Sequence, residues 1–212
     1  MPDYLPGFVL LSACLPALAA QTVSIGITVG GQMTNDFGQS WSLSTPRLLL
    51  GPTVRVQTTS GFGFETDLLH KDIEFEYSVG RPGLAYGSYR MSANVWQLPL
   101  LLNYERRFGK LTPFVYGGWT VRWTTGAMRA GQYCIQLPSI VCTPFTETGL
   151  SEGDRQITNG PAAGGGVGFG AGMLRLSPEV RFTRWLQRAI AQPPSAQNEV
   201  DLLLRVAIQF GR

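Results

Sequence analysis

The sequence is short of the residues that soluble enzymes use for chemistry, and these shortages narrow its function. Charged residues make up 15% of the 212-residue chain, whereas a typical soluble domain has about a quarter. A single histidine, His70, argues against metal centres built from several imidazoles and against a Ser–His–Asp triad. The net charge of +3 includes no basic stripe, so nucleic acid is not expected as a partner. No phosphate-binding loop, EF-hand loop or paired Cys-x-x-Cys motif is present, so no cofactor or metal is expected.

Long apolar runs are also scarce, and the run near the amino terminus is too short to cross a bilayer comfortably as a helix. Residues 5–20, LPGFVLLSACLPALAA, close on Ala17-Leu18-Ala19, a small-x-small pattern typical of cleavage sites. This pattern predicts a signal peptide over residues 1–20 and an exported domain over residues 21–212. An alternative lies inside the run, because Leu11-Ser12-Ala13-Cys14 is similar to a lipobox that would place a lipid on Cys14.

Two of the three cysteines remain once the predicted signal peptide is removed. Cys134 and Cys142 lie close together in the stretch CIQLPSIVC. An even pair in an exported protein favours a disulfide. The alternative, two free thiols, would leave reactive groups in an oxidising compartment.

In place of long runs, the chain has apolar residues at every second position in segment after segment. This period predicts β-strands, and no helix of ordinary length competes in the mature chain. The third segment changes phase between Phe64 and Ile73, so we expect a bulge near residues 69–71 or a strand that leaves the buried zone there. The eight segments are 23–29, 48–57, 62–77, 96–105, 115–123, 164–169, 174–183 and 199–210.

Prolines interrupt three of the predicted strands. Pro52, Pro99 and Pro178 each lack the backbone donor that a sheet interior requires. We therefore expect local bulges at these prolines, or positions near a rim.

Short and long connections alternate strictly along the chain. Short links follow the second, fourth and sixth segments, at 58–61, 108–111 and 170–173. Longer ones follow the other segments, at about 32–45, 78–91, 126–160 and 188–197. Tight turns on one side and long loops on the other are typical of bacterial outer-membrane barrels, in which an even strand number returns both termini to the periplasm.

The two faces of the predicted strands differ in a way that favours a membrane barrel over a soluble one. The apolar faces carry Leu, Val, Phe and Trp, with Trp96, Tyr104, Trp123 and Trp185 near segment ends, where interfacial girdles occur. The opposite faces carry nearly balanced charges, which an eight-stranded barrel would interlock in its narrow interior as a plug. This predicted lumen network comprises Arg55, Glu65, Asp67, Glu105, Arg122, Arg175, Glu179, Arg181, Glu199, Asp201 and Arg205.

A glycine run, GPAAGGGVGFGAG, contains the dinucleotide-binding spacing at Gly166, Gly168 and Ala171. That fingerprint requires a strand before it and a helix after it. Another alternating strand, LRLSPEVRF, follows instead. We therefore interpret the glycines as a thin sixth strand that leaves room for bulky lumen residues such as Arg175 and Arg181.

Five stretches resemble the outer-membrane β-barrel domain family, the small bacterial barrels of the OmpA and OmpX type. The resemblance implies an eight-stranded antiparallel up-and-down transmembrane β-barrel, surrounded by outer-membrane lipids. Ile208 and Phe210 are similar to the carboxy-terminal signal read by the barrel-assembly machinery, although Gly211 and Arg212 follow the aromatic residue. The stretches are PTVRVQTTSGFGFETDLLHKDIEF, NVWQLPLLLNYERRFG, LTPFVYGGWTVR, LRLSPEVRFTRW and NEVDLLLRVAIQF.

Candidate catalytic groups are few, and we expect no enzyme. His70 has Asp67, Asp72 and Glu74 nearby in the sequence, but no serine is identified as a nucleophile. The pairs Glu65/Asp67 and Glu74/Glu76 are each on one strand face, where ion pairs are the simpler interpretation. The sequence thus predicts a structural or surface-interaction barrel with a plugged lumen and names no external partner. A narrow transport channel and a lipid-modifying barrel enzyme are the alternatives.

Overall fold

The chain folds into one antiparallel sheet that closes into a barrel. The computed structural model describes residues 22–34, 42–43, 48–81, 85–137, 139–150, 153–190 and 195–211, so the predicted signal peptide and Cys14 lie outside the described residues. No helix in these ranges is long and apolar enough to cross a membrane. The strands are β1 (Thr22–Gln32), β2 (Ser42–Leu43), β3 (Leu48–Gln57), β4 (Phe62–Asp67), β5 (Leu69–Arg81), β6 (Ala85–Glu105), β7 (Leu111–Leu137), β8 (Ser139–Thr148), β9 (Ile157–Ala171), β10 (Leu174–Arg184) and β11 (Asn198–Gly211).

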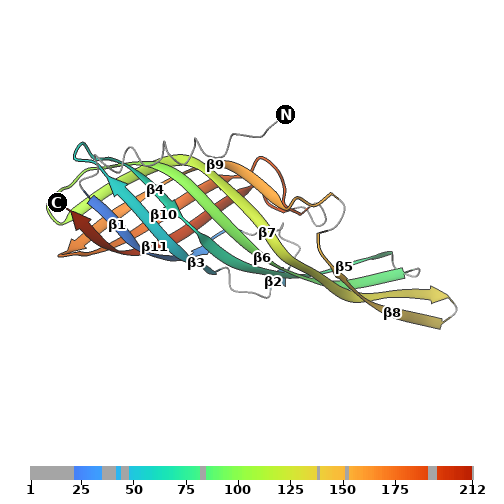
Figure 1. Ribbon diagram of the computed structural model, residues 1–212. Helices are drawn as coiled ribbons and strands as arrows, with labels where there is room; N and C mark the ends of the chain where they lie inside the picture. The colour runs from blue at the N-terminus through green and yellow to red at the C-terminus, as the bar shows by residue number, and fades with distance from the viewer. Residues whose placement is uncertain are drawn as a thin grey trace, which may run out of the picture.

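Eight strands form the ring of the barrel, with β4 and β5 acting as two pieces of one strand (Figure 1). The order around the ring is β1, β3, β4/β5, β6, β7, β9, β10 and β11, and every pairing is antiparallel. The first and last strands close it, from Val23 opposite Phe210 to Gln32 opposite Asp201. The predicted eight-stranded antiparallel up-and-down barrel is confirmed.

Tight turns gather at one end of the barrel, which we call the turn end. They lie between β3 and β4, between β6 and β7, and between β9 and β10, where the sequence predicts its three short links. Gly61, Gly109 and Gly172 adopt positive φ angles of 89°, 61° and 65° in these turns, a backbone conformation that glycine adopts without steric cost. Thr22 and Gly211 pair at the same end.

At the opposite end of the barrel, which we call the hairpin end, two segments that were predicted as loops are mostly strand. The segment 78–91 is mostly strand, because β5 and β6 stay paired out to Arg81 opposite Ala85. The segment 126–160 is also largely strand, since β7 continues to Leu137 and returns as β8. Figure 1 shows these strands extending well beyond the ring as a protruding sheet. The alternation of apolar and polar residues stops before these strands end, because a sheet that is exposed on both faces needs no apolar face.

The break in the third barrel strand falls at Leu68, between β4 and β5, but the predicted phase change is wrong. Glu65, Asp67, Leu69, Lys71 and Ile73 all point inward and are buried, so the inward parity is continuous. The inward residues of this strand are charged up to Lys71, apart from Leu69, and apolar beyond it, at Ile73 and Phe75.

Two prolines flank that break. Pro52 on β3 and Pro99 on β6 stand opposite the Leu68 region, and the ladders on both sides of β4/β5 lose pairs there. The register is nevertheless the same above and below the gap, because Thr53 pairs with Asp67 and Leu50 with His70. Pro178 similarly interrupts the β9–β10 ladder. The prolines therefore remove rungs without the predicted bulges; the register shift lies at Ser92/Asn94, opposite Gly126.

The barrel interior is layered. Towards the turn end, the inward faces are mainly charged and hydroxyl-bearing. Towards the hairpin end, an apolar cluster fills the interior, and residues of the β10–β11 connection fold into it. This cluster comprises Ile73, Phe75, Met91, Ala93, Val95, Ala127, Ala189 and Ile190.

Candidate functional site

The surface of the barrel is inverted relative to a soluble protein. Outward-facing Leu102, Val115 and Ile27 are 71%, 61% and 56% exposed, whereas inward-facing Glu65 and Arg205 are 0% and 2% exposed. Strands β3, β10 and β11 alternate in this way along most of their length. Apolar side chains are stable on such an exterior only against hydrocarbon, and the ring leaves no unpaired strand edge there.

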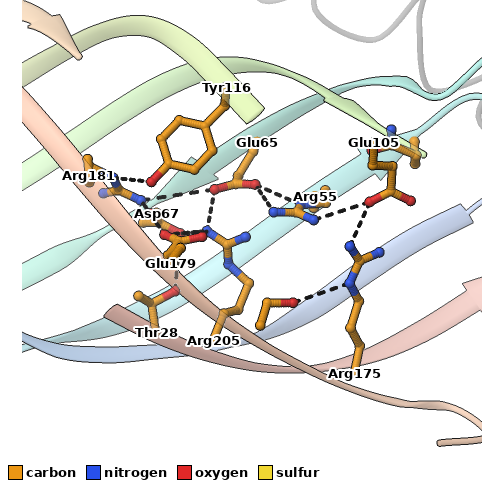
Figure 2. A network of polar contacts seen from close by, with 12 residues as sticks. Thr28, Arg55, Glu65, Asp67, Glu105, Tyr116, Arg175, Glu179, Arg181 and Arg205 are labelled. Carbon is orange, nitrogen blue, oxygen red and sulfur yellow. Dashed lines mark hydrogen bonds and ion pairs between the residues drawn. The ribbon is translucent and has the colours of Figure 1, made fainter. Parts of the chain in front are cut away.

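The part of the interior network nearest the turn end is built around Glu105 (Figure 2). Arg55 on β3 donates from Nε to Glu65 at 2.7 Å and from Nη1 to Glu105 at 3.4 Å. Arg175 on β10 donates to the same Glu105 oxygen at 2.7 Å and to Ser177 Oγ at 3.2 Å. Glu105 therefore ties together arginines from two strands that are far apart in the sequence.

Two further arginines crosslink the middle of the barrel. Arg181 donates to Asp67 at 2.5 Å and to Glu179 at 3.2 Å. Arg205 donates to Glu65 and, at 3.2 Å, to Glu179. Figure 2 shows these side chains converging from β4, β10 and β11 onto one level of the interior.

Two hydroxyl groups form hydrogen bonds with the charged side chains in the middle of the barrel. The Tyr116 hydroxyl accepts a hydrogen bond from Arg181 Nε at 3.4 Å, and Thr28 donates to Asp67 at 3.3 Å. Charge-assisted bonds of this kind are about twice as strong as neutral ones. Four arginines face four carboxylates, so this part of the interior is electrically balanced.

A second cluster lies closer to the hairpin end and centres on Glu199 of β11. Gln97 and Trp185 donate to its carboxylate at 2.7 and 2.8 Å. Lys71 lies 3.2 Å from Glu199 Oε1 and Arg122 lies 3.6 Å from Oε2. The guanidinium of Arg122 also sits 4.0 Å from the centroid of the Trp185 ring. Glu199 is thus enclosed by two cations and two neutral donors.

The structure places every residue of the predicted lumen network on the inward face, ten of them buried and Glu105 partly exposed. Asp201 is fully buried on β11, between the two clusters in the register. Sequence reasoning missed Lys71, Gln97 and Gln32, which contacts Lys71. Lys71 is an even number of residues away from Glu65 and Asp67, so a regular strand would point all three side chains inward. The phase change predicted at residues 69–71 concealed this pattern. With Lys71 included, six cations face six carboxylates.

The prediction that Trp185 belongs to the aromatic girdle is wrong. The sequence pattern assigned it to the membrane interface together with Trp96, Tyr104 and Trp123. Its side chain is instead 1% exposed inside the barrel, because it lies just past the end of β10, where the chain turns inward. The other three aromatic side chains remain on the outward face.

Two gaps beside the charged clusters are small. The gap bordered by Arg55, Arg175 and Arg205 leaves no room for a water molecule. A cavity of about 20 Å³ lies near Lys71, Arg122 and Ile190, enough for one water. At these two places the charged side chains leave room for at most one water molecule.

The glycines of β9 make room for this packing. A Cβ on Gly168 would stand 2.6 Å from Arg175 Nη2, as the sequence suggested. Beside Arg181, the space at Gly164 is used by Tyr116, whose hydroxyl would lie 2.6 Å from an added Cβ. Gly168 therefore leaves space for Arg175 itself, whereas Gly164 leaves space for Tyr116, which contacts Arg181.

The candidate catalytic residues do not assemble around His70. Its side chain is on the outward face, 3.6 Å from Asp72 and 4.5 Å from the Trp96 ring centroid, while Asp67 points inward. Glu74 and Glu76 both pair with Arg90, at 2.9 and 2.7 Å. In the described ranges, no group of three or more His, Cys, Asp or Glu residues could hold a metal ion.

The cysteines are joined. Cys134 on β7 and Cys142 on β8 stand opposite each other in the register and form a disulfide. It crosslinks the protruding hairpin outside the ring.

The ring and its inverted surface define the class of the protein, a small transmembrane β-barrel. The sequence matches no protein-family model and no curated protein. Among solved structures, the chain is similar to Neisserial surface protein A, with 9% identity, a TM-score of 0.47, and coverage of 90% of this chain and 98% of that one.

Two further solved structures are similar over a comparable length. The N-terminal β-barrel domain of Pseudomonas aeruginosa OprF has 13% identity and a TM-score of 0.43, covering 90% of this chain and 98% of that one. Ail, the attachment invasion locus protein of Yersinia pestis, crystallised with the heparin analogue sucrose octasulfate, has 9% identity and a TM-score of 0.42, covering 89% and 97%.

Proposed function

We propose that this chain is a bacterial outer-membrane protein with a structural or surface-interaction role, and that its lumen is closed by the charge network. The observation that carries the proposal is the combination of a lipid-compatible exterior with a balanced, tightly packed interior. The turn end faces the periplasm and the hairpin end faces the outside of the cell, as in barrels of this architecture. Export uses the predicted signal peptide, residues 1–20.

Aromatic side chains support this placement in the membrane. Rings are exposed around the turn end, at the level where lipid headgroups would lie, and Trp96 stacks near Trp123 towards the hairpin end, 6.4 Å between centroids. Interfacial belts of this kind anchor barrels at both membrane surfaces. The turn-end rings belong to Phe62, Tyr104, Phe108, Phe169 and Phe210.

The last strand supports recognition by the barrel-assembly machinery. Ile208 and Phe210 are each 47% exposed on the outward face of β11, beside the ring closure with β1. Their side chains point towards lipid rather than into the lumen, so they are accessible before the ring closes. Outer-membrane lipids then surround the finished barrel.

The protruding sheet is the surface that we assign to interaction outside the cell. β8 ends the strand order of the described sheet, and Ile140 and Val141 on it are 64% and 58% exposed. Tyr133 and Ile135 on β7 add further exposed apolar area. Exposed apolar patches rimmed by polar residues commonly mark interaction sites. The disulfide crosslinks the two strands of this hairpin.

Two measurements test the proposal. The protein should be found in the outer-membrane fraction and should migrate differently on gels before and after boiling; absence from that fraction, or identical migration, would contradict the membrane barrel. Folded protein reconstituted in planar bilayers should show no discrete conductance steps, because Arg–carboxylate pairs and the apolar cluster fill the lumen. Discrete openings would instead establish the narrow channel.

A further inference from the structure

A pocket opens at the turn end of the barrel, separate from the packed interior. Its volume is about 210 Å³, roughly ten times that of the cavity near Lys71. Liquid water occupies about 30 Å³ per molecule, so the pocket has room for a small hydrated anion. It is lined by Arg107, Gly109, Lys110, Thr112, Gly170, Gly172, Arg175 and Gln209.

The lining is basic. Three of its residues are cationic and none is acidic. Arg175 is already paired with Glu105 inside the balanced network. Arg107 and Lys110 are exposed on the β6–β7 turn and form no ion pair with another described residue. They therefore add two positive charges at the rim that no carboxylate of the described residues pairs with.

The backbone keeps the pocket open. Gly109 lies in the β6–β7 turn, Gly170 near the end of β9 and Gly172 in the β9–β10 turn, and a Cβ added to any of them would meet nothing within 4 Å. The Thr112 hydroxyl and the Gln209 amide supply neutral polar groups on the inward face. A fork-shaped guanidinium, an ammonium and nearby hydroxyl and amide donors are the groups that bind phosphate oxygens in proteins.

The pocket lies at a height along the barrel where phosphate groups of lipids are close by. Exposed Phe108 and Met173 lie on these two turns and exposed Leu111 begins β7, so the rim stands where the apolar belt ends and lipid headgroups begin. We propose that this turn-end pocket binds a phosphate group, either from an anionic phospholipid headgroup of the adjacent leaflet or from free inorganic phosphate. The site is independent of the proposed outward-facing role.

The test uses isotope-labelled folded protein in maltoside micelles, whose headgroup contains no phosphate. Sodium phosphate, and separately dihexanoyl-phosphatidylglycerol, is titrated against sodium chloride at equal ionic strength, and the amide resonances of Gly109, Gly170 and Gly172 are followed. Saturable shifts with inorganic phosphate identify a free-phosphate site. Saturable shifts with the lipid alone identify a headgroup site. No saturable shift with either probe overturns the proposal.

Variants separate the pocket from general charge. Arg107→Gln with Lys110→Gln should weaken binding at least tenfold, because the two exposed cations of the rim are lost while Arg175 and the network remain. The matched control is Arg155→Gln with Arg188→Gln, two exposed positions towards the hairpin end, which should leave the affinity unchanged. Equal weakening in both double variants would contradict the proposal, because it would reflect net charge alone. Heat-modified migration of every variant verifies folding.

Discussion

Replacing Glu65 by Gln tests whether the interior network is truly desolvated. The Glu65 carboxylate is 0% exposed, accepts from Arg55 at 2.7 Å, contacts Arg205 and lies 4.0 Å from Arg181. The substitution keeps the size of the side chain but leaves four arginines facing three carboxylates. Removing one partner of a buried ion pair costs about 3–5 kcal/mol, because the charge left behind has no counterion. We expect the free energy of unfolding to fall by that amount.

The assay is urea unfolding of the protein folded in lipid vesicles, followed by tryptophan fluorescence and by heat-modified migration. Glu147→Gln, at an exposed site on β8, is the matched control and should change stability by less than about 0.5 kcal/mol. Glu65→Gln combined with Arg55→Gln should cost less than the sum of the two single changes, because it restores charge balance. If Glu65→Gln unfolds within about 0.5 kcal/mol of the parent protein, water must solvate the network and the plugged-lumen argument fails.

Three further changes test the packing of the barrel and the place of the disulfide, by the same unfolding assay or by proteolysis. Gly166→Ala should destabilise the barrel, because its Cβ would overlap the backbone of Pro178 and Glu179, whereas Gly170→Ala has open space and should be neutral. Trp185→Phe should cost about 1.5–3 kcal/mol through loss of the 2.8 Å bond to Glu199, and Trp119→Phe on the exposed outward face should cost clearly less. Cys134→Ser with Cys142→Ser should leave barrel unfolding unchanged but expose the β7–β8 hairpin to protease; a large loss of barrel stability would contradict its position outside the ring.

The fold was largely predictable because a transmembrane barrel imposes a period of two on nearly every strand. Each strand must present apolar side chains to lipid and the remainder to a narrow interior, so Leu202 and Leu204 alternate with Asp201, Leu203 and Arg205 in a readable way. The positions of the short turns followed from the same pattern. The members of the lumen network could be named because charged residues can avoid lipid only by pointing inward.

Prediction failed where the two faces stop differing in polarity. Ile73 and Phe75 point inward in the same phase as Glu65, but their apolar character suggested an outward face and a shifted phase. Lys71 was overlooked for the same reason. Beyond the membrane, β7 and β8 lose alternation because both faces are exposed to solvent, so paired strands were taken for a long loop.

The strand period, the turn positions, the inverted faces and the charged residues of the interior can all be derived from the amino-acid sequence, because they are local consequences of a strand between lipid and lumen. Which charges meet depends on the assembled barrel. Glu105 reaches both Arg55 and Arg175, and Glu199 gathers Lys71, Arg122, Gln97 and Trp185, because ring closure and register bring distant strands to the same height. Those pairings depend on which strands become neighbours and on their stagger around the barrel, which no single strand encodes.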